Sequence, residues 1–151
     1  MDATGRENVK TCGLYLGMRL AEIERKTEAI ADFAELGDYI DQPVRIYSTG
    51  MLMRLGFAIA TAIDPEILLL DEGLATGDAQ FARKAELRMR KLISRSPILV
   101  IASHSMSLLS TICTSCVQLD HGKIVEAGTP KEVARCYQEA VVAKAALNDA
   151  D

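Results

Sequence analysis

Long apolar segments and a targeting sequence are both missing from this chain. The apolar run from Leu55 to Ile63 is far shorter than the roughly 20 residues that a helix needs to span a bilayer. The first residues, Met1-Asp2-Ala3-Thr4, lack the cationic and apolar pattern of a signal peptide. We therefore expect a cytoplasmic protein that reaches a membrane only through a partner.

An excess of positive charge is missing as well. The 151 residues carry a formal net charge of −4, which gives no electrostatic reason to expect binding to nucleic acid or to an acidic membrane surface. Hydrophobic residues make up 49% of the chain and charged residues 25%, as in an ordinary globular protein, and no repeat or low-complexity tract interrupts it. The composition therefore predicts a soluble fragment of one domain with a single core.

The cysteines offer only one closely spaced pair. Cys113 and Cys116 have the C-x-x-C spacing of metal and redox sites, but no second ligand pair follows at the spacing of a zinc site. Free cysteine is among the most buried residue types and packs as a small hydrophobe. We therefore favour a structural role for this pair, and we assign His121 to a turn rather than to a metal site.

Local patterns predict several helices and strands. The segment from Leu20 to Leu36 has helical periodicity and is ended by Gly37-Asp38. A hairpin is predicted from strands at 116–119 and 123–126 around the turn Asp120-His121-Gly122, and a helix is predicted to begin with a capping box at 129–132. The apolar stripe expected on the first of these helices consists of Ile23, Ala29, Ile30, Phe33 and Ala34.

The segment Ile67-Leu68-Leu69-Leu70-Asp71-Glu72 is the most informative in the chain. Four aliphatic residues in a row are typical of a parallel strand that is covered on both faces. Open α/β sheets bind their ligands at the carboxyl ends of the strands, so Asp71 and Glu72 fall where a site would form. Taken alone, the segment is also compatible with a core strand that runs into an acidic turn.

Two further segments point to the same kind of site. Ser48 precedes the weakly charged segment from Leu52 to Ile63 and is a good helix N-cap. The first-turn N–H groups and the helix dipole favour a bound anion, and Gly50 would let a phosphate approach closely. The stretch from Pro97 to Ala102 predicts a second buried strand that leads directly to His104, which could reach the same site.

Together these residues resemble the nucleotide-binding subunit of an ABC transporter, most closely the branch that exports bacterial polysaccharides such as O-antigen and capsule. The resemblance runs from about Thr4 to the helix after Pro130. In that family Glu72 falls on the catalytic glutamate and His104 on the switch histidine. The remaining motifs are the signature motif at Ser48 to Met51, the Walker B strand at Ile67 to Asp71 and the D-loop at Ala75 to Asp78.

Some residues depart from the general family pattern. Thr49 stands where many members have a second glycine, Met51 where many have glutamine, and Gly77 where the D-loop usually has a larger residue. These choices resemble the polysaccharide exporters, which is why we name that branch.

The resemblance implies an α/β fold that is only part of a P-loop NTPase (RecA-like) domain. The chain contains no G-x-x-x-x-G-K-S/T loop, so we expect the N-terminal half of the core, with its phosphate-binding loop, to be absent. Residues 4–63 should form a helical subdomain that ends in the signature helix, residues 64–129 the C-terminal half of the core with its parallel sheet, and residues 130–151 a C-terminal helix. The unpaired edge left beside the Walker B strand should make the isolated chain marginally stable and a weak binder of ATP.

The resemblance also implies roles with ATP and Mg²⁺ as cofactors. Asp71 would hold Mg²⁺ through water, Glu72 would orient the attacking water, and His104 would contact the γ-phosphate. For Glu72 and His104 the alternative is a solvated surface residue or a satisfied hydrogen bond.

Two partners are implied in the same way. In this family two nucleotide-binding subunits sandwich ATP head to tail, so Ser48, Thr49 and Gly50 would act on nucleotide held by the opposite subunit. Asp78 would lie at the seam between the subunits. Ser48 and Asp78 could instead only cap the helices that follow them. The second implied partner is a transmembrane permease, which would hold the subunit at the inner face of the cell membrane.

Three functions are compatible with this sequence. We favour a part of the ATPase subunit that energises polysaccharide export. The first alternative is a non-catalytic module that lends its signature helix to a complete partner subunit. The second is a metal or redox protein that uses Cys113 and Cys116.

Overall fold

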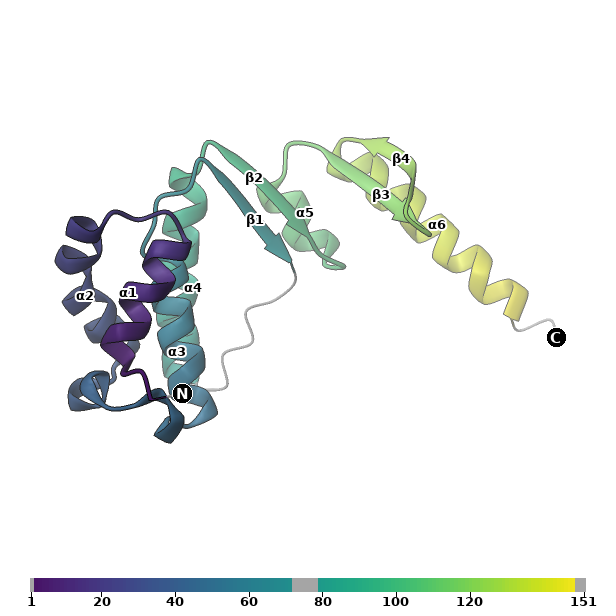
Figure 1. Cartoon of the computed structure of the whole chain (residues 1–151). Coiled ribbons are helices and arrows are strands. Elements are labelled where there is room, and N and C mark those ends of the chain that lie inside the picture. Colours follow the sequence, from purple (N-terminus) through teal and green to yellow (C-terminus); the bar gives the residue numbers. More distant parts are fainter. Residues whose placement is uncertain (1, 72–78, 149–151) are drawn as a thin grey trace. The chain divides into compact units, whose positions relative to one another are not determined.

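The computed structural model describes residues 2–71 and 79–148, with side chains for residues 2–71 and 81–139 (Figure 1). The described chain is mostly helical and falls into two compact units. The first contains the residues up to 68 together with α4, and the second contains the end of β1, most of β2 and everything that follows. The elements are α1 (Gly5–Tyr15), α2 (Leu20–Ala34), the 3₁₀ helices η1 (Gly37–Asp41) and η2 (Val44–Ile46), α3 (Thr49–Ala60), β1 (Ile67–Asp71), α4 (Ala79–Arg95), β2 (Ile98–Ala102), α5 (Met106–Ile112), β3 (Cys116–Asp120), β4 (Lys123–Gly128) and α6 (Pro130–Asn148).

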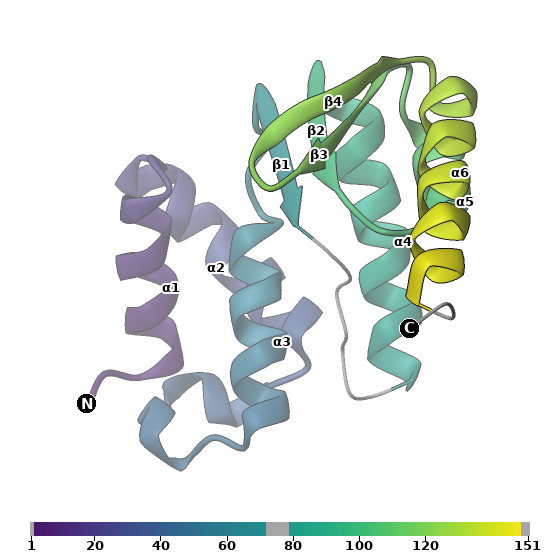
Figure 2. The same ribbon diagram turned by 90° about the vertical axis from the view of Figure 1, so that its right-hand side faces the viewer.

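Helices α1, α2 and α3 pack together around the core of the first unit (Figure 2). Helix α1 begins with a capping box, in which the Thr4 hydroxyl accepts from the Glu7 N–H and the Glu7 carboxylate accepts from the Thr4 N–H. The core side chains are aliphatic, with Tyr47 at one side, where its hydroxyl donates to the Tyr39 carbonyl oxygen. The most enclosed of them are Val9, Ile23, Ile30, Ala34 and Ala58.

The predicted stripe of α2 is correct in part. Ile23, Ile30 and Ala34 are buried, but Ala29 is exposed, and Thr27 and Ala31 are buried in its place. Position 29 lies about 100° around the helix from Ile30, so it turns away from the core.

The predicted end of α2 is also wrong. The helix stops at Ala34, where Glu35 adopts the left-handed conformation with φ of 56°. The predicted stop at Gly37-Asp38 instead begins the 3₁₀ helix η1.

Helix α4 is attached to α2 and α3 by aromatic and cationic side chains. Phe33, Phe57 and Phe81 form a cluster with ring centroids 5.6 to 6.0 Å apart. The Lys84 ammonium donates to the Phe33 carbonyl oxygen at 3.0 Å and to the Glu35 carboxylate at 2.8 Å. This cluster explains why α4 belongs to the first unit although it follows the first strand in sequence.

Strands β1 and β2 form a two-stranded parallel sheet, as predicted, but the prediction that both are buried is wrong. In each strand, exposed and half-buried residues alternate. Ile67 is 56% exposed and Leu69 70%, while Ile98 and Val100 on the partner strand are 51% and 54% exposed. One face of this sheet is therefore exposed among the described residues, whereas the residues on the other face are half-buried.

The C-terminal hairpin and the start of α6 match the prediction. Strands β3 and β4 pair antiparallel, with Asp120 opposite Lys123. His121 and Gly122 have positive φ values of 47° and 77°, which is the type I′ geometry that fits a two-residue hairpin turn. The capping box before α6 is present, because Thr129 and Glu132 exchange backbone-to-side-chain hydrogen bonds.

None of the helices in the described residues is long and apolar enough to cross a membrane. The predicted domain boundaries at residues 63/64 and 129/130 concern the organisation of a complete nucleotide-binding domain, and they stay predictions.

Candidate functional site

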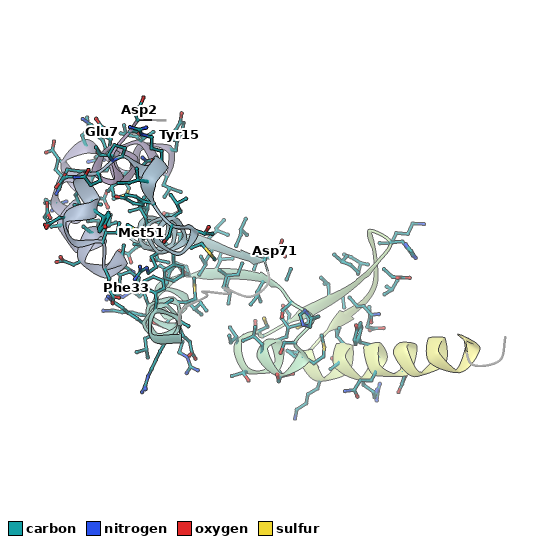
Figure 3. The ribbon with its side chains drawn as sticks, turned by 90° about the horizontal axis from the view of Figure 1, so that it is seen from below. Asp2, Glu7, Tyr15, Phe33, Met51 and Asp71 are labelled. Carbon is teal, nitrogen blue, oxygen red and sulfur yellow. The ribbon has the colours of Figure 1, made fainter. Side chains whose placement is uncertain are left out.

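Asp71 and His104 lie at the same edge of the β1–β2 sheet. Asp71 is the last residue of β1, where its carboxylate is exposed (Figure 3). β2 ends at Ala102, and His104 follows two residues later with an exposed side chain. Since the two strands are hydrogen-bonded neighbours that run in the same direction, their carboxyl ends bring these residues to a common edge.

Two serines fix the backbone on either side of His104. The Ser103 hydroxyl accepts from the Ser105 N–H at 3.1 Å. The Ser105 hydroxyl in turn caps α5 by accepting from the Leu108 N–H at 3.4 Å. The chain therefore turns sharply between β2 and α5, and His104 lies at this turn.

His104 also lines a cavity of about 240 Å³ within the second unit. This cavity is bounded by α5, β3 and α6, with Cys116, Gln118 and Tyr137 among its walls. Gln118 and Tyr137 could not be found from local sequence, because they come from separate elements and share no local spacing. Their contribution depends on the packing of the hairpin against α5 and α6.

The helix predicted to begin after Ser48 is present as α3, and anion binding at its N-terminus stays a prediction. The Ser48 hydroxyl accepts from the Met51 N–H at 3.2 Å, which confirms Ser48 as the N-cap. Thr49 and Gly50 occupy the first turn, where N–H groups have no carbonyl of a preceding turn to bind. Among the described residues, a side-chain carbon placed on Gly50 would approach only the Ser48 hydroxyl, at 3.9 Å.

The predicted site residues are thus divided between the two units. Ser48, Thr49 and Gly50 belong to the first unit, whereas Asp71 and His104 belong to the second. Glu72 and Asp78 lie outside the described residues.

The sequence analysis also considered a metal or redox site at Cys113 and Cys116, with His121 assigned to a turn. All four cysteines are free and half-buried. Within residues 2–71 and 79–148, no group of three or more histidine, cysteine, aspartate and glutamate side chains is arranged to hold a metal ion.

No family model matches the chain, but several known proteins are similar to it in sequence. The chain is 49% identical over 125 residues to the O-antigen export system ATP-binding protein RfbE of Yersinia enterocolitica, covering 83% of this chain and 52% of that protein. It is 41% identical over 140 residues to the O-antigen export system ATP-binding protein RfbB of Myxococcus xanthus, covering 93% of this chain and 32% of that protein. The chain is a homologue of ABC transporter ATP-binding subunits.

A similar protein that is named for a different export system supports this conclusion. The homologous segment of the teichoic acids export ATP-binding protein TagH of Listeria monocytogenes is 39% identical over 138 residues, which is 91% of this chain and 41% of that protein. The resemblance inferred from the motifs, including the polysaccharide-export branch, is therefore confirmed. The chain spans between about a third and about half of the length of these three relatives.

The fold prediction is confirmed by a solved structure. The ATP-binding subunit of an ABC transporter matches with a TM-score of 0.68 at 20% identity, over 90% of this chain and 57% of the solved chain. At this identity the match concerns the fold alone. This chain therefore has the α/β fold of part of an ABC transporter ATP-binding subunit.

Proposed function

We propose that this chain acts as part of an ATP-binding, ATP-hydrolysing subunit that energises export of a cell-surface polysaccharide such as O-antigen or capsule. The observation that carries the proposal is the similarity, over more than four fifths of the chain, to proteins named for O-antigen and teichoic acid export. The partners in this proposal are a second nucleotide-binding subunit and a transmembrane permease. The chain would be cytoplasmic and held at the inner face of the membrane by that permease.

The edge of the β1–β2 sheet would provide the hydrolytic groups. Asp71 fits a role in holding Mg²⁺ through water, because its carboxylate is exposed at the strand end and carboxylate oxygen is a preferred ligand of this ion. When bound, Mg²⁺ would neutralise charge on the phosphates. Glu72 would orient and polarise the attacking water, and His104 would contact the γ-phosphate from the neighbouring strand end.

The N-terminus of α3 would provide the phosphate contacts to the opposite subunit. The Ser48 hydroxyl and the Thr49 and Gly50 N–H groups lie at the start of a 12-residue helix, whose dipole favours negative charge there. In a head-to-tail dimer these groups would act on ATP held by the other subunit. Asp78 would lie at the dimer seam and couple the two sites.

A second candidate function is favoured by one observation. The chain contains no G-x-x-x-x-G-K-S/T sequence, while the α3 end is fully formed. The formed α3 end fits a non-catalytic module that would lend its signature helix to a complete partner subunit and support one active site instead of two. The DNA upstream of the Met1 codon distinguishes the candidates, because an in-frame phosphate-loop sequence would favour the complete ATPase subunit.

The proposed role of α3 can be tested by supplying the signature motif from this chain. A complete subunit of the same class, with its own signature serine replaced by arginine, is mixed with this chain in the presence of Mg-ATP. We expect the wild-type chain to restore ATP hydrolysis and Ser48→Arg to abolish the restoration, since the bulky arginine side chain would replace the capping hydroxyl at the helix end.

The matched control is Ser94→Arg, which changes an exposed serine on α4 in the same unit. This variant should restore hydrolysis as well as the wild type does. Equal restoration by Ser48→Arg, or no restoration by the wild-type chain, would contradict the proposed function.

A further inference from the structure

The net charge of −4 is distributed unevenly along the chain. Helix α4 contains six of the 17 lysines and arginines but only one of the 21 aspartates and glutamates. The helix therefore carries a formal charge of +5, while the remainder of the chain carries −9. A local surface of this helix can thus attract an anionic partner although the whole chain is acidic.

Two of the six cations on α4 are used inside the first unit. Lys84 donates to the Phe33 carbonyl oxygen and to the Glu35 carboxylate, as described above. The Arg88 guanidinium lies over the Phe33 ring, 4.1 Å from its centroid, and donates to the Thr61 carbonyl oxygen at 3.3 Å. These two side chains hold α4 against α2 and α3, so they do not face a partner outside the unit.

The other four cations on α4 are exposed. The buried side of the helix contains Phe81, Ala85 and Leu92. Because an α-helix turns by about 100° per residue, residues three or four positions apart share a face, and the exposed cations recur at this spacing away from the buried side. The basic stripe, as we call it, consists of Arg83, Arg90, Lys91 and Arg95.

Acidic side chains neutralise the basic stripe only in part. Arg90 pairs with Glu86 one turn earlier at 2.8 Å, and Arg95 lies 3.7 Å from the Asp64 carboxylate. Both pairs are solvent-exposed, and exposed pairs are weak enough to be exchanged for another anion. Among the residues that the structure describes, the other two cations of the stripe form no ion pair. The stripe therefore presents excess positive charge to solvent.

We propose that the basic stripe docks this chain directly on an anionic phospholipid surface. Basic side chains along one face of a helix are typical of proteins that bind acidic membranes. Leu87 lies among the stripe cations and is 63% exposed, so an apolar side chain would enter the headgroup region with them. Single-stranded nucleic acid fits this face less well, because Phe81, the one aromatic residue of α4, is buried and cannot stack on bases.

The acidic remainder of the chain does not cancel this attraction. At physiological ionic strength the Debye length is about 8 Å, whereas an α-helix with its side chains is about 10–12 Å thick. Charges behind α4 therefore lie more than one Debye length farther from a surface that the stripe touches. Their repulsion is largely screened, while the stripe cations lie at the headgroups.

The choice of a membrane as partner rests on the proposed function, which holds the chain at the inner face of the cell membrane. The permease would remain the specific anchor, and the basic stripe would add a contact with the surrounding lipid. The two proposals have separate tests, because vesicle binding requires neither nucleotide nor a permease. Absence of vesicle binding would remove the lipid contact without affecting the restoration of ATP hydrolysis, and failed restoration would leave vesicle binding intact.

The experiment measures co-sedimentation of the purified full chain with sucrose-loaded vesicles at low ionic strength. One set of vesicles contains phosphatidylcholine alone, and the other contains phosphatidylglycerol in addition. We expect binding to the anionic vesicles only, with release as salt is added. The triple variant Arg83→Gln, Arg90→Gln, Lys91→Gln should lower the partition coefficient at least about tenfold, since each cation near an anionic surface contributes about a factor of five.

The matched control removes three cations from exposed positions elsewhere in the first unit. Lys10→Gln, Arg19→Gln, Arg25→Gln changes residues at α1 and α2 and alters the net charge by the same amount. This variant should bind anionic vesicles as the wild type does. Equal loss of binding in both triple variants would show that net charge, and not the basic stripe, controls the interaction.

Ser94 supplies a change of opposite sign that does not depend on the folding of a triple variant. It is exposed beside the stripe, and its hydroxyl donates to the Lys91 carbonyl oxygen at 2.9 Å. Ser94→Arg and Ser94→Glu both lose this hydrogen bond, so the difference between them reports the charge. We expect Ser94→Arg to bind anionic vesicles more strongly than the wild type and Ser94→Glu to bind more weakly.

Three results would overturn the proposal. Anionic vesicles could fail to retain the wild-type chain, the stripe variant could bind as the wild type does, or the two Ser94 variants could bind equally. Stronger binding to duplex DNA than to anionic vesicles, with loss in the stripe variant, would also overturn it and assign the basic stripe to nucleic acid.

Discussion

Glu132 is a single carboxylate whose charge state is tied to the start of α6. Its carboxylate accepts from both the hydroxyl and the N–H of Thr129, at 2.7 and 2.8 Å. These hydrogen bonds, led by the one from the hydroxyl, lower the pKa of Glu132 below its usual value. The carboxylate is therefore favoured by folding, and its stabilising effect is present above the ordinary glutamate pKa.

This pKa shift predicts how stability depends on pH. As the pH falls through the lowered pKa of Glu132, the folded state loses the contribution of the charged carboxylate. We expect the free energy of unfolding of the wild type to fall relative to Glu132→Gln, which keeps a neutral acceptor for the capping box at every pH. Urea unfolding followed by circular dichroism, from neutral pH to below the ordinary glutamate pKa, measures the difference. A difference that does not change with pH would contradict the assignment.

At the level of elements, α4 is held by the cluster of Phe33, Phe57 and Phe81. Phe81 is only 1% exposed, whereas Leu87 on the same helix is 63% exposed. We expect Phe81→Ala to lower the free energy of unfolding by about 3–5 kcal/mol, because it removes a buried ring and leaves a cavity. Leu87→Ala should change it by no more than about 0.5 kcal/mol. Similar urea midpoints for the two variants would show that the aromatic cluster does not hold α4.

The open face of the β1–β2 sheet predicts self-association. Leu69 is 70% exposed on a strand rich in aliphatic residues, and an exposed apolar patch promotes association. We expect Leu69→Lys to reduce light scattering by concentrated samples while leaving the circular dichroism spectrum unchanged. Leu55→Lys is the contrasting variant, because Leu55 is 4% exposed and a charge there should unfold the first unit. Scattering that is the same for Leu69→Lys and the wild type would contradict the prediction.

The elements also show what the sequence could and could not predict. Capping residues such as Ser48 and Thr129 act on N–H groups within four residues, so local sequence was enough to find them. The hairpin turn at His121 and Gly122 was equally local. The burial of β1 could not be predicted in this way, because it depends on which elements cover the sheet. The cavity around His104 also depends on packing between distant segments.

At the scale of the whole molecule, the chain corresponds to between about a third and about half of the three relatives described above. Its residues offer a carboxylate, an imidazole and a capped helix end, but no G-x-x-x-x-G-K-S/T loop. We therefore expect Mg-ATP to bind this chain far more weakly than it binds a complete ATP-binding subunit. Isothermal titration calorimetry on the purified chain tests this, and micromolar affinity would refute it.

The measurement that tests the central proposal most directly is paramagnetic broadening by Mn²⁺-ATP, with Mn²⁺ in place of Mg²⁺. Backbone amide signals of the chain are recorded by nuclear magnetic resonance during a titration at high nucleotide concentration. If the edge that carries Asp71 and His104 receives the metal–nucleotide complex, these two signals should broaden first and the effect should decline toward Ile67 and Ile98. Asp71→Asn should weaken the broadening. Equal broadening at both ends of the strands, or broadening that Asp71→Asn leaves unchanged, would contradict the account.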